Sequence, residues 1–137
     1  MALRDEILEQ PAVLQSLLED HAEKIISIAE QIGTPAGVVI AARGTSDNAA
    51  RYAKYLLGAN NRIPVTLAAP SLSSVYQSTP NFQNQLVIGI SQSGESPDLL
   101  AVLQEANKQN CPPGYIRLYV PGKSIFLRTR KRRAVPV

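Results

Sequence analysis

One stretch of the chain predicts both the fold class and a candidate binding site: LVIGISQSGES, residues 86–96. Its first five residues are apolar and rich in β-branched side chains, which is typical of a buried strand in a parallel sheet. After the polar loop, apolar residues recur at helical spacing, with Ser96 as a suitable N-cap and Pro97 as a suitable first helical residue. The stretch therefore predicts a strand, a hydroxyl-rich loop and the positive end of a helix, an arrangement that favours phosphate or another anion.

A second stretch of the chain repeats this shape. Residues 37–42, GVVIAA, are typical of a buried strand, and Arg43, Gly44, Thr45 and Ser46 lead from it into an alanine-rich helical pattern. Ser46 is expected to cap that helix, but capping does not explain why Gly44 and Thr45 precede it. Glycine and serine between a strand and a helix are also ordinary turn residues, so a turn without a ligand is the alternative for either loop alone. The repetition favours a binding site.

The rest of the chain alternates strands with helices, which predicts an α/β fold. We expect three layers, a parallel sheet with flanking helices on both faces, preceded by an amphipathic helical segment. The carboxyl ends of parallel strands share one edge of the sheet, so the two hydroxyl-rich loops can converge there. The remaining predicted elements are helices over 3–10 and 11–32, divided at Pro11, a strand over 63–69, a helical turn within 70–76 and a strand over 115–120.

The composition is that of an ordinary globular chain of one domain. The 137 residues are 45% apolar and 18% charged, and no apolar run reaches the length of about 18 residues that a transmembrane helix needs, so no membrane partner is expected. The single cysteine, Cys111, excludes an internal disulfide and favours a reducing compartment, so we expect a cytoplasmic location. One histidine and one cysteine cannot form a familiar zinc site, and His21 is expected to be a surface or helix-packing residue. No metal or cofactor is predicted.

The charge is divided unevenly along the chain. The first 116 residues contain seven basic and eleven acidic residues, whereas the last 21 contain seven basic residues and no acidic one. The formal net charge of +3 therefore comes from the tail, while the rest of the chain is acidic. A nucleic-acid partner is not predicted, because the body is mildly acidic and the tail offers little aromatic surface beyond Phe126.

The loop sequences exclude two familiar nucleotide-binding motifs. Neither a Gly-Lys-Ser/Thr phosphate loop nor a G-x-G-x-x-G dinucleotide motif is present. The loop over 91–96 contains hydroxyls and backbone amides but no lysine or arginine. Such a loop suits a single phosphate monoester, as on a phosphorylated sugar, and leaves hydroxyl partners for the sugar itself.

At these two loops the chain resembles the sugar isomerase (SIS) domain family. The matching segments are Arg43-Gly44-Thr45-Ser46 and Ile90-Ser91-Gln92-Ser93-Gly94-Glu95-Ser96, and the likeness runs from about residue 4 to about residue 111. Within the family the chain is most similar to the isomerase half of the glutamine–fructose-6-phosphate aminotransferases and to related sugar-phosphate deaminases and isomerases. The resemblance implies a homodimer with a five-stranded, parallel, Rossmann-like sheet that binds a hexose 6-phosphate or an amino sugar phosphate.

The resemblance also implies roles for individual residues. Ser91, Ser93 and Ser96, with the backbone of Gln92, would hold the phosphate, and Thr45 and Ser46 would contact the phosphate or the sugar. Gly44 and Gly94 belong to the same substrate-binding loops. Glu95 would be a loop residue and not a base. The catalytic base, ring-opening histidine and C-terminal lysine of the family match no residue here, so no catalytic residue is assigned.

The resemblance divides the chain into three parts: a helical segment over 1–36, a partial SIS domain over 37–120 and a basic tail over 121–137 that is expected to be irregular. The abrupt loss of acidic residues suggests the hypothesis that this tail is a truncated or frame-shifted translation product. A genuine basic extension is the alternative.

The leading functional hypothesis is the first SIS domain of an aminotransferase, isomerase or deaminase of amino sugar metabolism, which is not catalytically complete alone. A regulatory module that senses a sugar phosphate and acts through a partner is the alternative, although residues 1–36 contain no helix-turn-helix pattern that would favour it. A non-functional fragment is the third reading, and it would expose apolar sheet surface and an unpaired strand edge.

Overall fold

A computed structural model describes residues 3–91, 94–109, 111, 115–119 and 126–128. The chain divides into two compact units, Met1–Gly33 and Thr34–Val137, and each is described by itself. None of the helices in the described ranges combines the length and the hydrophobicity that a membrane span requires.

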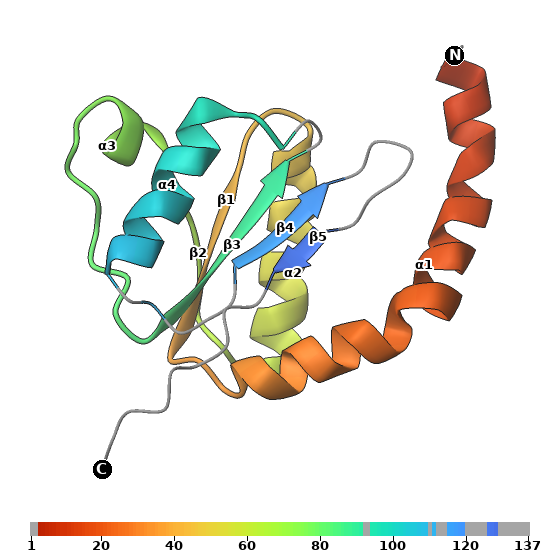
Figure 1. The fold of residues 1–137 in the computed structure, drawn as a ribbon, viewed down its shortest axis with the longest axis horizontal. Coiled ribbons are helices and arrows are strands. Elements are labelled where there is room, and N and C mark those ends of the chain that lie inside the picture. The colour runs from red at the N-terminus through yellow and green to blue at the C-terminus, as the bar shows by residue number, and fades with distance from the viewer. Residues whose placement is uncertain (1–2, 92–93, 110, 112–114, 120–125, 129–137) are drawn as a thin grey trace. The chain divides into compact units, whose positions relative to one another are not determined.

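The first unit is a single helix, α1 (Leu3–Ile32), which Figure 1 shows as one continuous ribbon. The predicted division at Pro11 is wrong, because this proline lies inside the helix. Proline removes one backbone hydrogen bond, but the turns on both sides are rich in Leu, Glu, Gln and Ala, which favour helix strongly enough to continue it. Gly33 ends the helix in a left-handed conformation (φ 66°), and its N–H donates to the carbonyl of Ala29.

The second unit is built on a five-stranded sheet with the order β2-β1-β3-β4-β5 (Figure 1). The first four of these strands are parallel, and β5 runs antiparallel to β4. The strands are β1 (Gly37–Ala42), β2 (Val65–Leu67), β3 (Gln85–Ser91), β4 (Tyr115–Tyr119) and β5 (Phe126–Arg128).

The sheet confirms the predicted α/β class and corrects three details. β2 is shorter than the predicted strand over 63–69: it begins after Pro64, which has no N–H to donate to a ladder, and it ends at Leu67. The all-parallel five-stranded sheet is wrong at its last strand, which pairs antiparallel. The expectation of an irregular segment over 121–137 is wrong at Phe126–Arg128, where two large apolar residues favour a strand; the rest of that segment lies outside the described residues.

Helices cover both faces of the sheet. They are α2 (Ser46–Asn61), the short α3 (Ser71–Ser74) and α4 (Pro97–Lys108). The chain passes from β1 to β2 in one direction across the sheet and from β3 to β4 in the other, so right-handed crossovers put α2 on one face and α4 on the opposite face. Figure 1 shows this arrangement, with α3 beside α4. The three predicted layers are therefore present.

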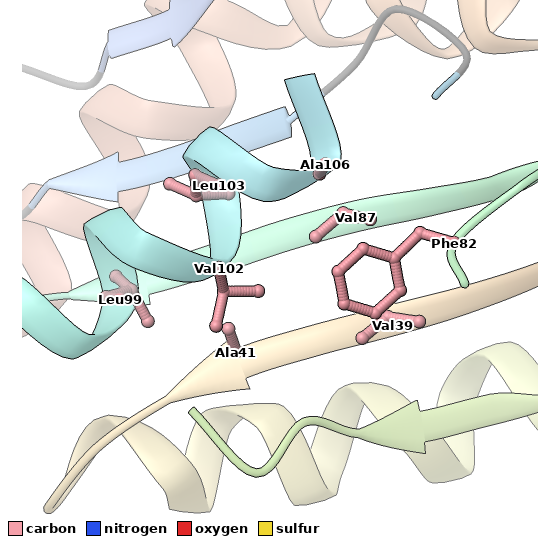
Figure 2. Packing of buried hydrophobic residues seen from close by; sticks show 8 residues of the cluster. All are labelled: Val39, Ala41, Phe82, Val87, Leu99, Val102, Leu103 and Ala106. Carbon is pink, nitrogen blue, oxygen red and sulfur yellow. The ribbon is translucent and has the colours of Figure 1, made fainter. Parts of the chain in front are cut away.

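The main core lies between α4 and the sheet (Figure 2). Strand alternation turns Val39, Ala41 and Val87 toward α4, while Val38 and Ile40 are buried toward the other face. The buried residues of α4 recur at helical spacing and form its inner face. The cluster consists of Val39, Ala41, Phe82, Val87, Leu99, Val102, Leu103 and Ala106.

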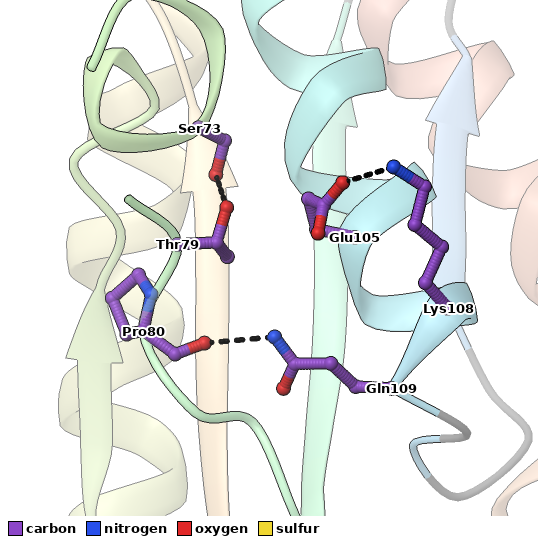
Figure 3. Close-up of polar contacts among 6 residues, drawn as sticks. All are labelled: Ser73, Thr79, Pro80, Glu105, Lys108 and Gln109. Carbon is purple, nitrogen blue, oxygen red and sulfur yellow. Dashed lines mark hydrogen bonds and ion pairs between the residues drawn. The ribbon is translucent and has the colours of Figure 1, made fainter. Parts of the chain in front are cut away.

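The side chain of Gln109, just past the end of α4, holds the segment that leads into β3. Its Nε2 donates to the carbonyl of Pro80 at 3.0 Å, and its Oε1 accepts from the backbone N–H of Phe82 at 2.7 Å. Figure 3 shows the first of these bonds, together with the bond from Thr79 to Ser73. The two bonds hold Phe82 in the core, where this residue is 4% exposed.

Truncation of the core side chain Leu103 should destabilise the second unit. Leu103→Ala is expected to lower the free energy of unfolding by about 2–5 kcal/mol, because a buried leucine leaves a cavity. Gln104→Ala, at the exposed neighbouring position of α4, should change it by less than about 0.5 kcal/mol. Urea denaturation followed by circular dichroism measures both, and equal effects would contradict the packing described.

Ionisation of the Cys111 thiol should lower the free energy of unfolding at alkaline pH. Burial raises the pKa of Cys111 above its ordinary value, and its Sγ–H donates to the carbonyl of Phe82 at 3.2 Å. The folded state therefore favours the neutral thiol, so this contribution is complete below the ordinary thiol pKa and is lost as pH rises through the raised one. The free energy of unfolding, measured from about pH 8 to about pH 10, should fall more steeply in the wild type than in Cys111→Ala. Parallel curves would contradict this.

Candidate functional site

The two hydroxyl-rich loops begin side by side at one edge of the sheet. β1 and β3 are neighbouring parallel strands, paired in register from Gly37 with Gln85 to Ala42 with Ile90. Arg43 therefore leaves the sheet beside Ser91, and the expected convergence of the two loops is confirmed for their first residues. We call Arg43–Thr45 the first loop and the segment from Ser91 to Ser96 the second loop.

These two strands also flank the point where the direction of the chain across the sheet reverses. From β1 the chain turns toward β2, and from β3 it turns toward β4 on the other side. The two loops therefore lie at the topological switch point of the sheet, at the carboxyl ends of its strands, which is where parallel α/β folds bind ligands.

The first loop turns sharply at Gly44, which has a left-handed backbone (φ 60°). The helix α2 begins at Ser46, so the prediction that Ser46 is the N-cap is wrong: Thr45 holds that position. The backbone of Thr45 is already helical (φ −66°, ψ −23°), and within the described part of the chain its side chain makes no capping hydrogen bond. The bonds Asp47 N–H to Gly44 O and Asn48 N–H to Thr45 O tighten the first turn instead, which leaves the exposed Thr45 hydroxyl available to a ligand.

The side chain of Ser91 forms a hydrogen bond across the second loop. This side chain is buried, 8% exposed, and its Oγ accepts a hydrogen bond from the N–H of Gly94 at 2.9 Å. Gly94 is buried in a left-handed conformation (φ 69°) that strongly favours glycine. Gln92 and Ser93, two of the predicted ligand residues, lie outside the described residues.

The helix α4 begins as the sequence predicted. Ser96 is the N-cap with an extended backbone (φ −61°, ψ 116°), and Pro97 is the first helical residue. Among the described residues the Ser96 side chain finds no capping partner. Because the first turn of a helix has no carbonyl for its amides, the N–H groups of Asp98 and Leu99 point beyond the helix end, whereas Leu100 N–H already bonds to Ser96 O. This end of α4 can therefore donate to an anion.

An ion pair between Arg43 and Asp98 joins the first loop to the start of α4. Arg43 Nη1 of the first loop lies 2.8 Å from Asp98 Oδ2 in the first turn of α4. Arg43 belongs to the motif of the first loop, but the sequence pattern predicted no role for it and did not single out Asp98. The sequence did contain a signal for this pair. A cation three or four residues after Asp98 could pair with it on the helix, but those positions hold Ala101 and Val102, so a partner for Asp98 has to come from another segment.

The chemistry at this edge suits binding more than catalysis. Hydroxyls, backbone amides and one arginine gather there, and the predicted residues Gly44, Thr45, Ser46, Ser91, Gly94 and Ser96 all lie on the two loops or at the helix starts that follow them. In the described ranges no three His, Cys, Asp or Glu side chains are grouped as metal ligands would be. The only histidine, His21, lies half-buried on α1.

A cavity of about 330 Å³ lies elsewhere, on the face of the sheet covered by α3 and α4. None of the predicted site residues that the structure describes lines it, and its lining is mostly apolar, with no charged side chain among the described residues. Its walls include Val39, Leu67, Leu72, Phe82 and Val102.

Comparison with known proteins identifies a family. The family model of the SIS domain matches residues 35–117. Two glutamine–fructose-6-phosphate aminotransferases (isomerizing) are similar to the chain: that of Thermococcus kodakarensis is 33% identical over 104 residues, and that of Bordetella parapertussis is 38% identical over 112 residues. The matches cover 75% and 76% of this chain but only 17% and 18% of those proteins, so the chain spans less than a fifth of the curated relatives it matches.

A solved structure extends the likeness to three dimensions. A protein described as a phosphosugar isomerase, from Silicibacter pomeroyi DSS-3, superposes with a TM-score of 0.77 at 31% identity. The superposition covers 85% of this chain and 36% of that chain.

The glycine of the first loop allows a test of its backbone geometry. Gly44→Ala is expected to lower the free energy of unfolding by about 1–2 kcal/mol, because a left-handed backbone is unfavourable for alanine. An added Cβ would meet no atom within 4 Å, so no clash contributes. Gly58→Ala is the matched control: it lies inside α2 with equal space and no left-handed backbone, and should raise stability by about 0.5–1 kcal/mol. Effects of the same sign would contradict the loop geometry.

Proposed function

Since the chain belongs to the SIS domain family, we propose that it binds a phosphorylated sugar, a hexose 6-phosphate or an amino sugar phosphate, at the carboxyl edge of its sheet. The observation that carries this proposal is the position of the two hydroxyl-rich loops on the neighbouring strands β1 and β3, at the point where the strand order reverses. The names of the similar proteins, aminotransferases that act on fructose 6-phosphate and a phosphosugar isomerase, support the same ligand class.

The phosphate belongs at the second loop in this proposal. The amides at the start of α4 and the hydroxyls of Ser91 and Ser96 supply neutral donors there. Ser93 and the backbone of Gln92, which lie outside the described residues, are assigned to the same phosphate by the family resemblance. A phosphate monoester is mostly a dianion at neutral pH, and hydrogen bonds to a charged acceptor are stronger than those between neutral groups. The positive end of the α4 dipole adds to this attraction.

The first loop serves the sugar or the remaining phosphate oxygens. Thr45 and Ser46 contribute hydroxyls from the start of α2, and Gly44 gives the loop the turn that directs them over the sheet edge. The hydroxyl of Thr45 is exposed and makes no cap bond among the described residues, so it is suited to a polar ligand. Because the second loop would bind the phosphate and the first loop the sugar, the site would bind a sugar phosphate more tightly than inorganic phosphate.

The wider role that we propose is that of the first SIS domain of an aminotransferase, isomerase or deaminase of amino sugar metabolism. In this role the chain supplies substrate binding and is not catalytically complete alone. A homodimer and a cytoplasmic location are part of the same proposal. The similarity to aminotransferases of which the chain spans less than a fifth supports a role as one module of such an enzyme.

A thermal-shift titration tests the ligand class. Fructose 6-phosphate and glucosamine 6-phosphate should raise the melting temperature, because a ligand that binds the native state stabilises it by mass action. Fructose should have no effect, and inorganic phosphate should have a smaller one than either sugar phosphate. An unchanged melting temperature with both sugar phosphates would contradict the proposal.

Removal of two serines from the second loop tests the site. Ser91→Ala combined with Ser93→Ala should abolish sugar-phosphate binding in isothermal titration, because each hydrogen bond to a charged phosphate contributes roughly 1.5–3 kcal/mol. Ser74→Ala combined with Ser78→Ala, which removes two hydroxyls at and after α3, is the control and should bind as the wild type does. Undiminished affinity in a folded Ser91/Ser93 variant would rule out the assigned site.

A further inference from the structure

The pair formed by Arg43 and Asp98 sits where the proposed phosphate site requires positive potential. Asp98 is the second helical residue of α4, so its carboxylate lies at the helix end whose amides face outward. A carboxylate stabilises that helix end in the absence of a ligand, but it repels an anion that approaches the same amides. Asp98 is therefore a charge that the site has to compensate.

The partner of Asp98 differs from that of Asp47, the corresponding residue of α2. Asp47 occupies the same second position of α2, and its Oδ2 pairs with Arg51 Nε at 2.8 Å, four residues later on the same helix. Asp98 has Val102 at the corresponding position of α4 and so has no such helical partner. Its cation comes from the first loop instead, at the same distance of 2.8 Å. The compensating charge thus links the first loop to the helix start at which we place the phosphate.

The exposure of the pair fits a role in charge compensation. The side chains of Arg43 and Asp98 are 56% and 32% exposed, and a pair so open to solvent contributes little to stability. The guanidinium presents five N–H donors, and its contact with Asp98 is through Nη1, which leaves the three donors on Nη2 and Nε for another acceptor.

We propose that Arg43 is a positioning residue that neutralises Asp98 and so allows a phosphate dianion to occupy the start of α4. This inference rests on the proposed function. The two residues then act on binding with opposite sign. Loss of Arg43 exposes the ligand to an uncompensated carboxylate, whereas loss of the Asp98 charge removes the repulsion and releases Arg43 toward the phosphate. A pair that served only as a structural tie would weaken binding when either partner was removed.

The test compares single and double variants by isothermal titration with fructose 6-phosphate at low salt. Arg43→Met should weaken binding by about three- to tenfold and Asp98→Asn should strengthen it by a similar factor, as expected for one unit charge near the protein surface. The double variant Arg43→Met/Asp98→Asn should return to within about twofold of the wild type, since the net charge at the site is then restored. Arg43→Lys keeps the charge and should bind within about twofold of the wild type.

A matched pair at the other end of α4 provides the control. Lys108 pairs with Glu105 at similar exposure, 70% and 30%, so Lys108→Met should leave the affinity unchanged. In about 1 M sodium chloride the opposite effects of Arg43→Met and Asp98→Asn should shrink together, because the screening length falls to about 3 Å.

The outcomes separate this inference from the proposed function. Opposite shifts with recovery in the double variant support it. Equal weakening by both single variants, or no change in either, overturns the role of Arg43 while the wild type still binds and the proposed function stands. A wild type that does not bind fructose 6-phosphate overturns the proposed function and this inference with it.

Discussion

The parallel pairing of β1 with β3 is the constraint on which the rest of the site depends. Six residue pairs in register bring the ends of these strands to the same level, although the strands are separated in the sequence by α2, β2 and α3. The buried face of α4 packs against both strands through Val39, Val87 and Leu99 and thereby fixes where that helix begins. A shift in this register would move Arg43 away from Ser91 and separate the two loops.

The loops themselves are shaped by backbone geometry more than by side-chain contacts. Gly44 and Gly94 both take left-handed conformations, and Ser91 closes the second loop through the N–H of Gly94. Thr45 and Ser96 hold the N-cap positions of α2 and α4 without a side-chain cap bond in the described part of the chain. Two helix starts at one sheet edge therefore bring amide and hydroxyl donors to the place where we propose that the anion binds.

Much of this arrangement could be predicted from the sequence because it follows from local patterns. The apolar run of β1 and the Ser96-Pro97 start of α4 were predicted at their observed positions. The continuity of α1 through Pro11 was missed because helix propensity on both sides outweighs one lost hydrogen bond. The Gln109 bonds to Pro80 and Phe82 were missed because they join distant segments, and no local pattern encodes such contacts. The antiparallel β5 was missed because the resemblance implied a parallel strand there.

The central claim is that a sugar phosphate binds between the two loops, and the most direct measurement is a map of backbone amide chemical shifts during titration with glucosamine 6-phosphate. The account predicts that the largest, saturable changes fall on the amides of residues 44–48 and 94–99, at the starts of α2 and α4. Inorganic phosphate should perturb mainly the second group. Changes centred on the apolar cavity near Leu72 and Phe82, or no saturable change, would contradict it.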